Sequence, residues 1–237
     1  MKITFLGTSH GVPEPNRKCS CAMIEAEGRI YFVDMGVMAI CELTDRGIPV
    51  ETVQGIFITH MHGDHTNGLI HFADLISWYY RGADPVIYLP LSEGAKIITD
   101  WIALSCHATR ELQYKVVQSG DLFDDGFLKV KAARTQHTNR SYAYRLEANG
   151  KAVLFTGDMQ KPSVDFPLEL ANEADLVICE GAHFPATEYK PVLEQCAPKR
   201  VIVNHYAPWN IPHIMTLAKD MPHLHVTMAH DGMEIQV

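Results

Sequence analysis

Thr59-His-Met-His-Gly-Asp-His65 carries three imidazoles and one carboxylate at positions 60 to 65. The side chains that can bind a ligand are those of His60, His62, Asp64 and His65. The preceding segment, Val53-Gln-Gly-Ile-Phe-Ile-Thr59, is short and rich in β-branched and aromatic residues, which predicts a buried strand. We therefore expect the cluster at the end of a strand, which is a rigid place to hold ligands.

The spacing within this cluster predicts a metal site. Side chains two positions apart on an extended backbone point to the same side, so His60 and His62 can bind one ion. Asp64 and His65 follow where the chain turns into the next helix, and Gly63 gives the backbone freedom for that turn. Imidazole suits Zn²⁺, Fe or Ni, and an added carboxylate is typical of catalytic rather than structural zinc. We favour an open, water-binding metal site over an exposed histidine-rich loop.

The composition places limits on the class of protein. The chain has 237 residues, of which 47% are hydrophobic and 20% charged, so it can bury a sizeable core, and we expect one domain over residues 1–237. The formal net charge is −8, and a negative field repels a polyanion. This predicts a small anionic substrate held by metal, and no extended nucleic acid as a partner.

The cysteines and the apolar segments predict a cytoplasmic location. The N-terminal apolar run is too short for a signal peptide, and no run approaches the length of about 18 apolar residues that crosses a membrane. We expect free thiols, including the Cys19-Ser-Cys21 pair, because no second pair has the spacing of a metal site. The six cysteines are scattered along the chain: Cys19, Cys21, Cys41, Cys106, Cys179 and Cys196.

Strand and helix patterns alternate along the whole chain. Strands are predicted at 2–6, 21–26, 29–33, 53–58, 86–89, 114–117, 127–132, 141–146, 151–155, 176–179, 201–203 and 234–237. Helices are predicted at 37–46, 67–80, 92–106, 167–171, 188–196 and 211–220. Long β-meanders with helices between them favour two packed sheets covered by helices on the outside.

Three further polar residues stand at strand exits. His137, Asp158 and His205 each follow a predicted strand, as His60 does, and Gly157 allows a close approach of the backbone beside Asp158. Packing does not explain why histidine or aspartate recurs just after three different strands, so we expect these three residues at the same metal site.

Together these motifs resemble the metallo-β-lactamase superfamily, and the resemblance covers nearly the whole chain. It implies an α/β fold, a four-layer αββα sandwich of two mixed β-sheets flanked by helices. It also implies two Zn²⁺ ions per chain, with Mn²⁺ or Fe as alternatives. His60, His62 and His137 would bind one ion, and Asp64, His65 and His205 the other, with Asp158 between the two.

The resemblance implies hydrolysis by a hydroxide that bridges the two ions. Two cations about 3.5–4 Å apart can share a water, lower its pKa and bind the substrate oxygen that gains charge. Asp64 is expected to orient this hydroxide in addition to binding metal.

Three segments are similar to the ribonuclease Z-like phosphodiesterases: Leu6-Gly-Thr-Ser-His-Gly-Val-Pro13, Tyr142-Ala-Tyr-Arg-Leu-Glu147 and Asp231-Gly-Met-Glu-Ile235. That branch includes tRNA 3′-processing enzymes and a cyclic-phosphate phosphodiesterase, so a small phosphodiester or nucleotide, linear or cyclic, is the expected substrate. Only about twenty residues separate His137 from Asp158, where ribonuclease Z enzymes carry a long tRNA-binding arm. This departure disfavours tRNA processing.

A candidate general acid lies just beyond the strand at 176–179. His183 could protonate the leaving alkoxide, with Glu180 fixing its tautomer, and the alternative is a loop histidine that caps a helix. His10 and His230 are expected at the same rim, where an ordinary surface role is favoured over substrate contact. Five other histidines receive no role: His71, His107, His213, His223 and His225.

Several alternatives to a dinuclear phosphodiesterase stay open. Lactone or thioester hydrolysis uses the same fold, and a mononuclear iron dioxygenase would use fewer of the ligands. A binding protein without turnover is disfavoured by the complete ligand set. The aromatic run Trp78-Tyr79-Tyr80 is either core or the contact face of a homodimer.

Overall fold

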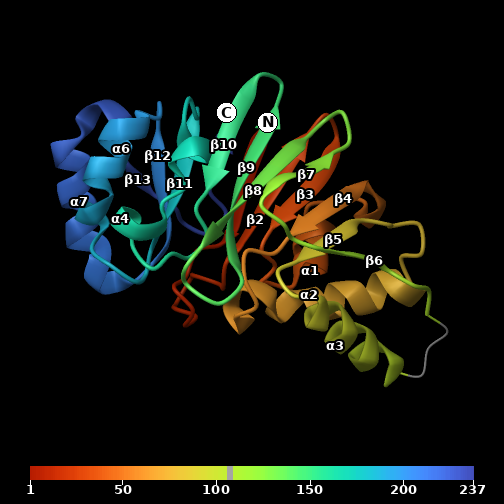
Figure 1. Ribbon diagram of the computed structural model, residues 1–237. Helices are drawn as coiled ribbons and strands as arrows, with labels where there is room; N and C mark the ends of the chain where they lie inside the picture. The colour runs from red at the N-terminus through yellow and green to blue at the C-terminus, as the bar shows by residue number, and fades with distance from the viewer. Residues whose placement is uncertain (106–108) are drawn as a thin grey trace.

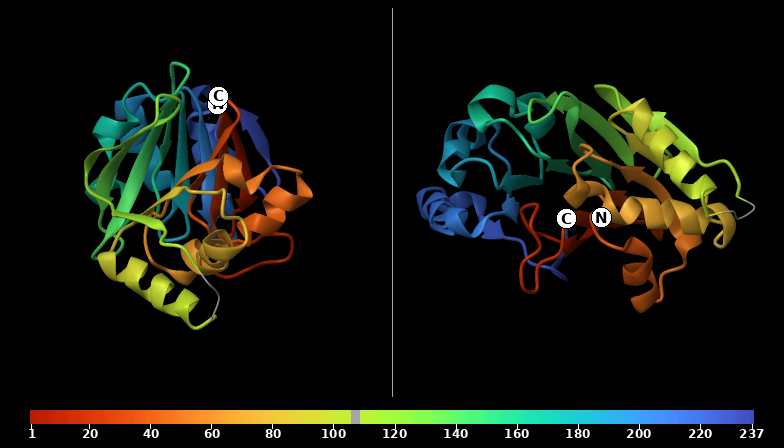
Figure 2. Two further views of the ribbon diagram at one scale, coloured as in Figure 1. Left: turned by 90° about the vertical axis from the view of Figure 1, so that its right-hand side faces the viewer. Right: turned by 90° about the horizontal axis from the view of Figure 1, so that it is seen from below.

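Two seven-stranded β-sheets pack face to face, and helices cover their outer faces (Figure 1). The computed structural model describes residues 1–105 and 109–237. Figure 2 shows the two sheets in the middle of the molecule and the helices on either side. The predicted αββα sandwich is confirmed.

The first sheet has the order β14-β1-β2-β3-β4-β5-β6. It is antiparallel from β14 to β3 and parallel from β3 to β6. Its strands are β1 (Lys2–Gly7), β2 (Cys21–Ala26), β3 (Arg29–Val33), β4 (Val53–Phe57), β5 (Val86–Leu89), β6 (Gln113–Val116) and β14 (Glu234–Gln236).

The second sheet has the order β13-β12-β11-β10-β9-β8-β7. It is antiparallel from β7 to β10 and parallel from β10 to β13. Its strands are β7 (Gly120–Asp124), β8 (Lys129–Thr135), β9 (Ser141–Ala148), β10 (Lys151–Phe155), β11 (Leu176–Gly181), β12 (Val201–Tyr206) and β13 (Thr227–Met228).

Helices connect the parallel strands of both sheets. The α-helices are α1 (Ala39–Asp45), α2 (Gly63–Trp78), α3 (Ser92–Ala103), α4 (Pro162–Asp165), α5 (Leu168–Ala171), α6 (Lys190–Cys196) and α7 (Ile211–Asp220). Short 3-10 turns lie at η1 (Val50–Thr52), η2 (Ala186–Tyr189), η3 (Pro208–Asn210) and η4 (Pro222–Leu224). Because these connections return each strand in the same direction, the carboxyl ends of the parallel strands meet at one edge of each sheet.

Three apolar clusters hold the layers together. Between the sheets, the ring of Phe57 from β4 lies 5.9 Å from that of Tyr144 in β9, measured between ring centres. Phe72 and Ile76 of α2 are buried against the outer face of the first sheet. Tyr189 and Leu193 belong to the cluster that covers the outer face of the second sheet. Most of the favourable folding free energy comes from burial of this kind.

Most predicted elements are present, and the differences lie at their ends. Helix α2 begins at Gly63 rather than at residue 67, so Asp64 and His65 lie in its first turn. The predicted helix 188–196 is a 3-10 turn followed by α6, with Pro191 in the first helical turn, where proline is tolerated. Strands β7 and β13 and helix α4 are short and were not predicted.

The two ends of the chain lie side by side (Figure 2), because Val237 donates its backbone N–H to the carbonyl of Met1 at 3.0 Å.

The cysteines of the described residues are five free thiols, as predicted. Cys106 and His107 lie outside the described residues. Within residues 1–105 and 109–237, no helix combines the length and the apolar character that a bilayer span requires.

Helix α2 can approach the segment after β3 because residue 68 is glycine. Its N–H donates to the carbonyl of Met35 at 2.9 Å, and a Cβ at Gly68 would lie 1.7 Å from the carbonyl oxygen of Val37. Since Met35 in turn donates to the carbonyl of His65 at 2.8 Å, this contact fixes the first turn of α2, which carries Asp64 and His65.

We predict that Gly68→Ala lowers the free energy of unfolding by about 1–3 kcal/mol, because the added methyl group clashes with backbone. Gly94→Ala in α3 is the matched control. Its Cβ would meet only the flexible ends of Met61 and Leu89, at 3.1 and 3.5 Å, so it should be neutral or stabilise by up to about 1 kcal/mol. Urea unfolding followed by circular dichroism measures both values, and equal stability of the two variants would contradict the packing described here.

Candidate metal centre

The seven predicted ligands meet where parallel strands of the two sheets end. The first sheet supplies His60 and His62 after β4, followed by Asp64 and His65 in the first turn of α2. The second sheet supplies the rest. His137 lies in the loop from β8 to β9, Asp158 follows β10, and His205 lies in β12. The structure thus brings together residues that are up to 145 positions apart in the sequence.

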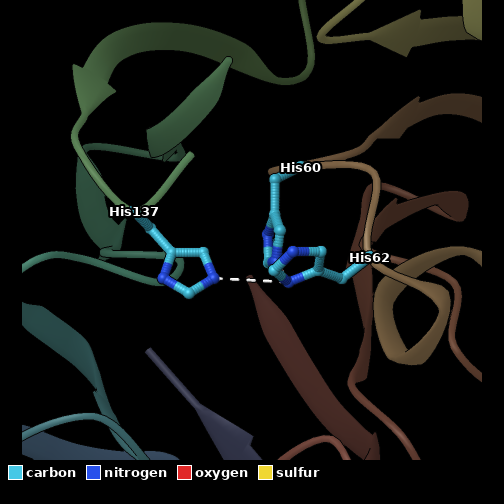
Figure 3. A group of neighbouring side chains, drawn as sticks. All are labelled: His60, His62 and His137. Carbon is cyan, nitrogen blue, oxygen red and sulfur yellow. Dashed lines mark hydrogen bonds between the residues drawn. The ribbon is translucent and has the colours of Figure 1, made fainter. Parts of the chain in front are cut away.

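Three histidines form one group of potential ligands. His60 and His62 face His137 across the site (Figure 3). Nε2 of His60 lies 2.9 Å from Nδ1 of His62, and Nε2 of His137 lies 3.3 Å from the same atom. One donor atom from each residue falls within 4.8 Å of the others, which suits a single ion.

Asp64, His65 and His205 form a second group with the same compactness. Oδ2 of Asp64 lies 3.1 Å from Nε2 of His65 and 3.8 Å from Nε2 of His205. Both histidines are buried, and the Asp64 carboxylate is partly exposed. A partly open group of this kind leaves room for water or substrate beside a bound ion.

Asp158 lies between the two groups. Its Oδ2 atom is 3.7 Å from Nε2 of both His60 and His137, 3.6 Å from that of His65 and 3.3 Å from that of His205. Its other oxygen, Oδ1, is buried and has no hydrogen-bond partner in the described part of the chain. A buried carboxylate oxygen without a partner is costly. The oxygen and nitrogen donors therefore fit a bound metal.

Hydrogen bonds from outside the cluster set the orientation of three imidazoles. Nδ1 of His65 lies 2.7 Å from Oδ2 of Asp34, and Nδ1 of His60 lies 3.1 Å from the hydroxyl of Thr59. His205 donates from Nδ1 to the carbonyl of Ser9 at 2.7 Å. These contacts occupy Nδ1 and turn Nε2 inward, as is usual around metal-binding histidines.

Asp34 is the residue of this site that we did not predict. It follows β3 directly and accepts hydrogen bonds from the backbone N–H of Thr59, at 2.8 Å, and from the Thr59 hydroxyl. Its position after a strand is the signal that identified His137 and Asp158, and the same rule would have found it. Asp34 therefore fixes the orientation of the His65 imidazole.

A β-bulge places His205. Asn204 pairs with Glu180 and Tyr206 with Gly181, so His205 is an extra residue on β12. Its φ of 47° lies in the left-handed region, which is unfavourable for a residue other than glycine. Bulges redirect side chains near functional sites, and this one turns His205 toward Asp158.

The environment favours neutral His60 and His137 and ionised carboxylates. Burial lowers the pKa of His60 to about 2 and that of His137 to about 4. Burial would raise the pKa of Asp158, but the charges of His205 and His65 hold it well below its usual range. Burial also opposes ionisation of Asp64, yet the hydrogen bond and charge of His65 lower its pKa to about 2. Neutral imidazoles and ionised carboxylates are the forms that bind metal.

His183 and Glu180 form a pair at the rim. The buried Glu180 carboxylate lies 2.8 Å from Nδ1 of His183 and also accepts the N–H groups of Met159 and Ala182, at 2.9 and 3.0 Å. Burial lowers the pKa of His183, but the hydrogen bond and charge of Glu180 outweigh it and raise this pKa. Nε2 of His183 lies 3.9 Å from Oδ2 of Asp158. Nε2 of His183 therefore points at the centre, and the raised pKa favours its protonated form.

The two other rim histidines make different contacts. Nδ1 of His10 lies 3.2 Å from Oε1 of Glu14, and Nδ1 of His230 lies 3.1 Å from the carbonyl oxygen of Asp231. Neither of these contacts involves a residue of the cluster.

The chain is similar to known phosphodiester hydrolases in sequence and in structure. Ribonuclease Z of Nitrosopumilus maritimus is 26% identical over 161 residues, which cover 68% of this chain and 54% of the relative. The chain thus spans about half the length of the curated relatives it matches.

Among solved structures, the short form of human tRNase Z has a TM-score of 0.79 and 25% identity, covering 100% of this chain and 99% of that chain. A diphosphatase of the PhnP family shares the fold with a TM-score of 0.72 at 16% identity, covering 100% of this chain and 97% of that chain. These findings confirm the predicted ribonuclease Z-like branch of the metallo-β-lactamase superfamily.

The comparisons also correct one prediction. We expected no extended nucleic acid as a partner, but the relatives are ribonucleases and a tRNase, so this expectation was wrong. Net charge was a poor guide because it averages over the whole surface, whereas a polyanion responds to the local field around a site.

The relatives and solved structures above identify the ribonuclease Z-like branch of the superfamily. A family model described as anti-Pycsar protein Apyc1 identifies a single family within it. It matches residues 1–206, which include all seven residues of the cluster together with Glu180 and His183. The chain therefore belongs to the anti-Pycsar protein Apyc1 family.

Proposed function

We propose that the protein is a metal-dependent phosphodiester hydrolase that uses two divalent ions, and that it cleaves a small phosphodiester or nucleotide, linear or cyclic. The observation that carries the proposal is the position of Asp158, whose Oδ2 lies within 3.7 Å of imidazole nitrogens from both ligand groups. The relatives named as ribonucleases and the PhnP-family diphosphatase support this class of enzyme.

The donor atoms indicate how two ions would be held. His60, His62 and His137 would bind one ion, and Asp64, His65 and His205 the other, with Asp158 shared between them. Imidazole and carboxylate donors suit zinc, with manganese or iron as alternatives. When bound, the ions would lower the pKa of a shared water and stabilise the negative charge that develops on the phosphate.

The residues of the chain have separate tasks in this reaction. The ionised Asp64 carboxylate orients the attacking water and can accept its proton. The water oxygen forms a bond to phosphorus, and the bond from phosphorus to the leaving oxygen breaks. Nε2 of His183 then gives its proton to that oxygen, while Glu180 holds Nδ1 and balances the positive charge.

Two observations favour this proposal over a mononuclear iron dioxygenase. Such an enzyme needs one group of ligands, whereas this chain gathers two groups around Asp158. The Glu180–His183 pair in addition supplies a proton donor. Hydrolysis with a poor leaving group requires such a donor, whereas binding of one iron does not.

The metal content of the protein tests the proposal first. We expect protein purified without added metal to contain about two ions of zinc or manganese per chain. Asp158→Asn should lower this ratio, because it removes the negative charge shared by both groups. Mass spectrometry of the metals gives the ratio, and a single iron per chain in the unaltered protein would rule out the hydrolase assignment.

The substrate class is tested by hydrolysis of bis-p-nitrophenyl phosphate. We expect His62→Ala to reduce kcat/KM by about 100-fold or more, because a ligand of one ion is lost. The matched control is His223→Ala, an exposed histidine in η4, which should leave the rate unchanged. Cyclic nucleotides, a lactone and a tRNA precursor complete the panel. Turnover of the lactone without turnover of any phosphodiester would refute the proposal.

The leaving group tests the role of His183. We expect His183→Ala to slow the hydrolysis of a dinucleotide, whose leaving group is a sugar alkoxide, by about 10²–10⁴-fold. Hydrolysis of bis-p-nitrophenyl phosphate should change far less, because p-nitrophenolate leaves without a proton. His230→Ala, at another exposed rim position, is the control for general damage. Equal slowing of both substrates by His183→Ala would argue against its role as an acid.

A further inference from the structure

Asn204 faces the space between the two sheets, next to the metal centre. On the same strand, β12, Ile202 belongs to the apolar cluster between the sheets, while Val201 and Val203 belong to the cluster on the outer face. Because side chains alternate between the two faces of a strand, Asn204 points inward as Ile202 does. Asn204 directly precedes His205, and the proposed reaction gives it no task.

Asn204 lines a cavity of about 30 Å³ between the sheets. Three of the seven candidate ligands line it as well, namely His65, Asp158 and His205. A cavity needs about 10–15 Å³ to hold one water molecule, and pockets for substrates or cofactors start at about 300 Å³. The cavity therefore has room for one or two water molecules or for a single ion, and it is too small for a substrate.

Two residues that line this cavity each have a buried oxygen without a hydrogen-bond partner within residues 1–105 and 109–237. The two atoms are Oδ1 of Asn204 and Oδ1 of Asp158. Asn204 is 8% exposed and Asp158 is 2% exposed. An amide oxygen and a carboxylate oxygen only accept hydrogen bonds, and a buried acceptor without a donor is costly. An occupant of the cavity that donates hydrogen bonds would satisfy both oxygens.

The two other carboxylates that line the cavity already have donors. Glu180 accepts the N–H groups of Met159 and Ala182, at 2.9 and 3.0 Å. Asp34 accepts the N–H of Thr59 at 2.8 Å. Buried polar groups of native proteins nearly always have such partners. Among the described carboxyl and amide groups of the cavity, the need for a further donor therefore arises at the two unpartnered oxygens.

Water suits this cavity better than a cation does. A buried water needs two to four polar partners, and the hydroxyl of Ser20, which also lines the cavity, can supply a third. A hard cation such as calcium takes about six to eight oxygen ligands, and two divalent ions at the metal centre would repel it. Much of the lining is instead apolar and offers no side-chain oxygen: Ala22, Val33, Phe155 and Ile178.

We propose that a water molecule in this cavity donates one hydrogen bond to Oδ1 of Asn204 and one to Oδ1 of Asp158, and accepts one from the Ser20 hydroxyl. A carboxylate has lone pairs for several partners, so Asp158 can bind this water and metal together. Through the water, Asn204 keeps Oδ2 of Asp158 directed at imidazoles of both ligand groups. Asn204 is thus a positioning residue of the metal centre. Its effect on metal binding rests on the proposed function, whereas the water site does not.

A crystal structure of the unaltered protein at high resolution tests the water site. We expect one density peak at about 2.5–3.0 Å from both Oδ1 atoms, the usual length of a hydrogen bond between oxygens. Absence of density in the cavity, or a peak that contacts only one of the two oxygens, would overturn the site. A peak surrounded by about six oxygens at about 2.3–2.6 Å would identify a cation and overturn it as well.

Asn204→Leu tests the positioning role, because leucine has the same branched shape as asparagine but accepts no hydrogen bond. We expect its Kd for zinc, measured by competition with a chelator, to rise about 10–100-fold, which is the usual effect of losing an outer partner of a metal ligand. The urea midpoint of the metal-free protein should change little. Ile202→Leu is the matched control, because it alters only apolar contacts on the same face of β12, and it should leave this Kd unchanged.

The remaining outcomes separate this inference from the proposed function. An unchanged Kd in Asn204→Leu, or an equal rise in Ile202→Leu, would contradict the positioning role. If Asn204→Leu does not fold, Asn204→Val removes the same acceptor with a side chain that suits a strand, and it carries the same expectation. Unaltered protein that binds no metal would contradict the proposed function instead, and the density in the cavity would still decide the water site.

Discussion

The buried carboxylate of Asp158 is the group on which the rest of the site depends. Moving a carboxylate from water into a protein interior costs several kcal/mol unless nearby positive charge compensates for it. Nε2 atoms of His65 and His205 lie 3.6 and 3.3 Å from Oδ2, one from each sheet, so the compensating charge is either a proton on these imidazoles or the ions that would replace it. Their other nitrogens are held in turn by Asp34 and by the carbonyl of Ser9. These outer hydrogen bonds keep both Nε2 atoms directed at Asp158.

The fold makes this arrangement possible by placing the carboxyl ends of parallel strands from two sheets side by side. The backbone before Asp158 can approach both sheets closely because residue 157 is glycine, whose φ is 59°. A Cβ at Gly157 would lie 2.7 Å from the carbonyl oxygen of Tyr142 in the second sheet and 3.2 Å from the side chain of Thr59, which follows the first sheet's β4. The β-bulge at His205 and the contact of Gly68 in α2 with the Val37 backbone likewise position ligand side chains. Backbone features at or next to the candidate ligands therefore set the geometry of the centre.

Sequence patterns predicted that the seven candidate ligands gather at one place, because most of them lie just after a strand and strands are recognisable from short runs of β-branched residues. Glu180 and His205 were expected beyond their strands but lie within them, since the last residues of β11 and β12 are defined by pairing between distant segments, including the bulge at His205. The strand-exit rule also covers Asp34, but its contact with His65, 31 positions away, is visible only in the folded chain. The partner was misjudged because overall charge averages over the whole surface and does not report the local field around a site.

The central claim is that two ions share the Asp158 carboxylate. Anomalous diffraction from crystals of the protein, recorded on both sides of the absorption edge of the bound metal, tests it most directly. Our account predicts two peaks about 3.5–4 Å apart, one beside His60, His62 and His137 and the other beside Asp64, His65 and His205. A single peak, or a second peak remote from Asp158, would contradict it.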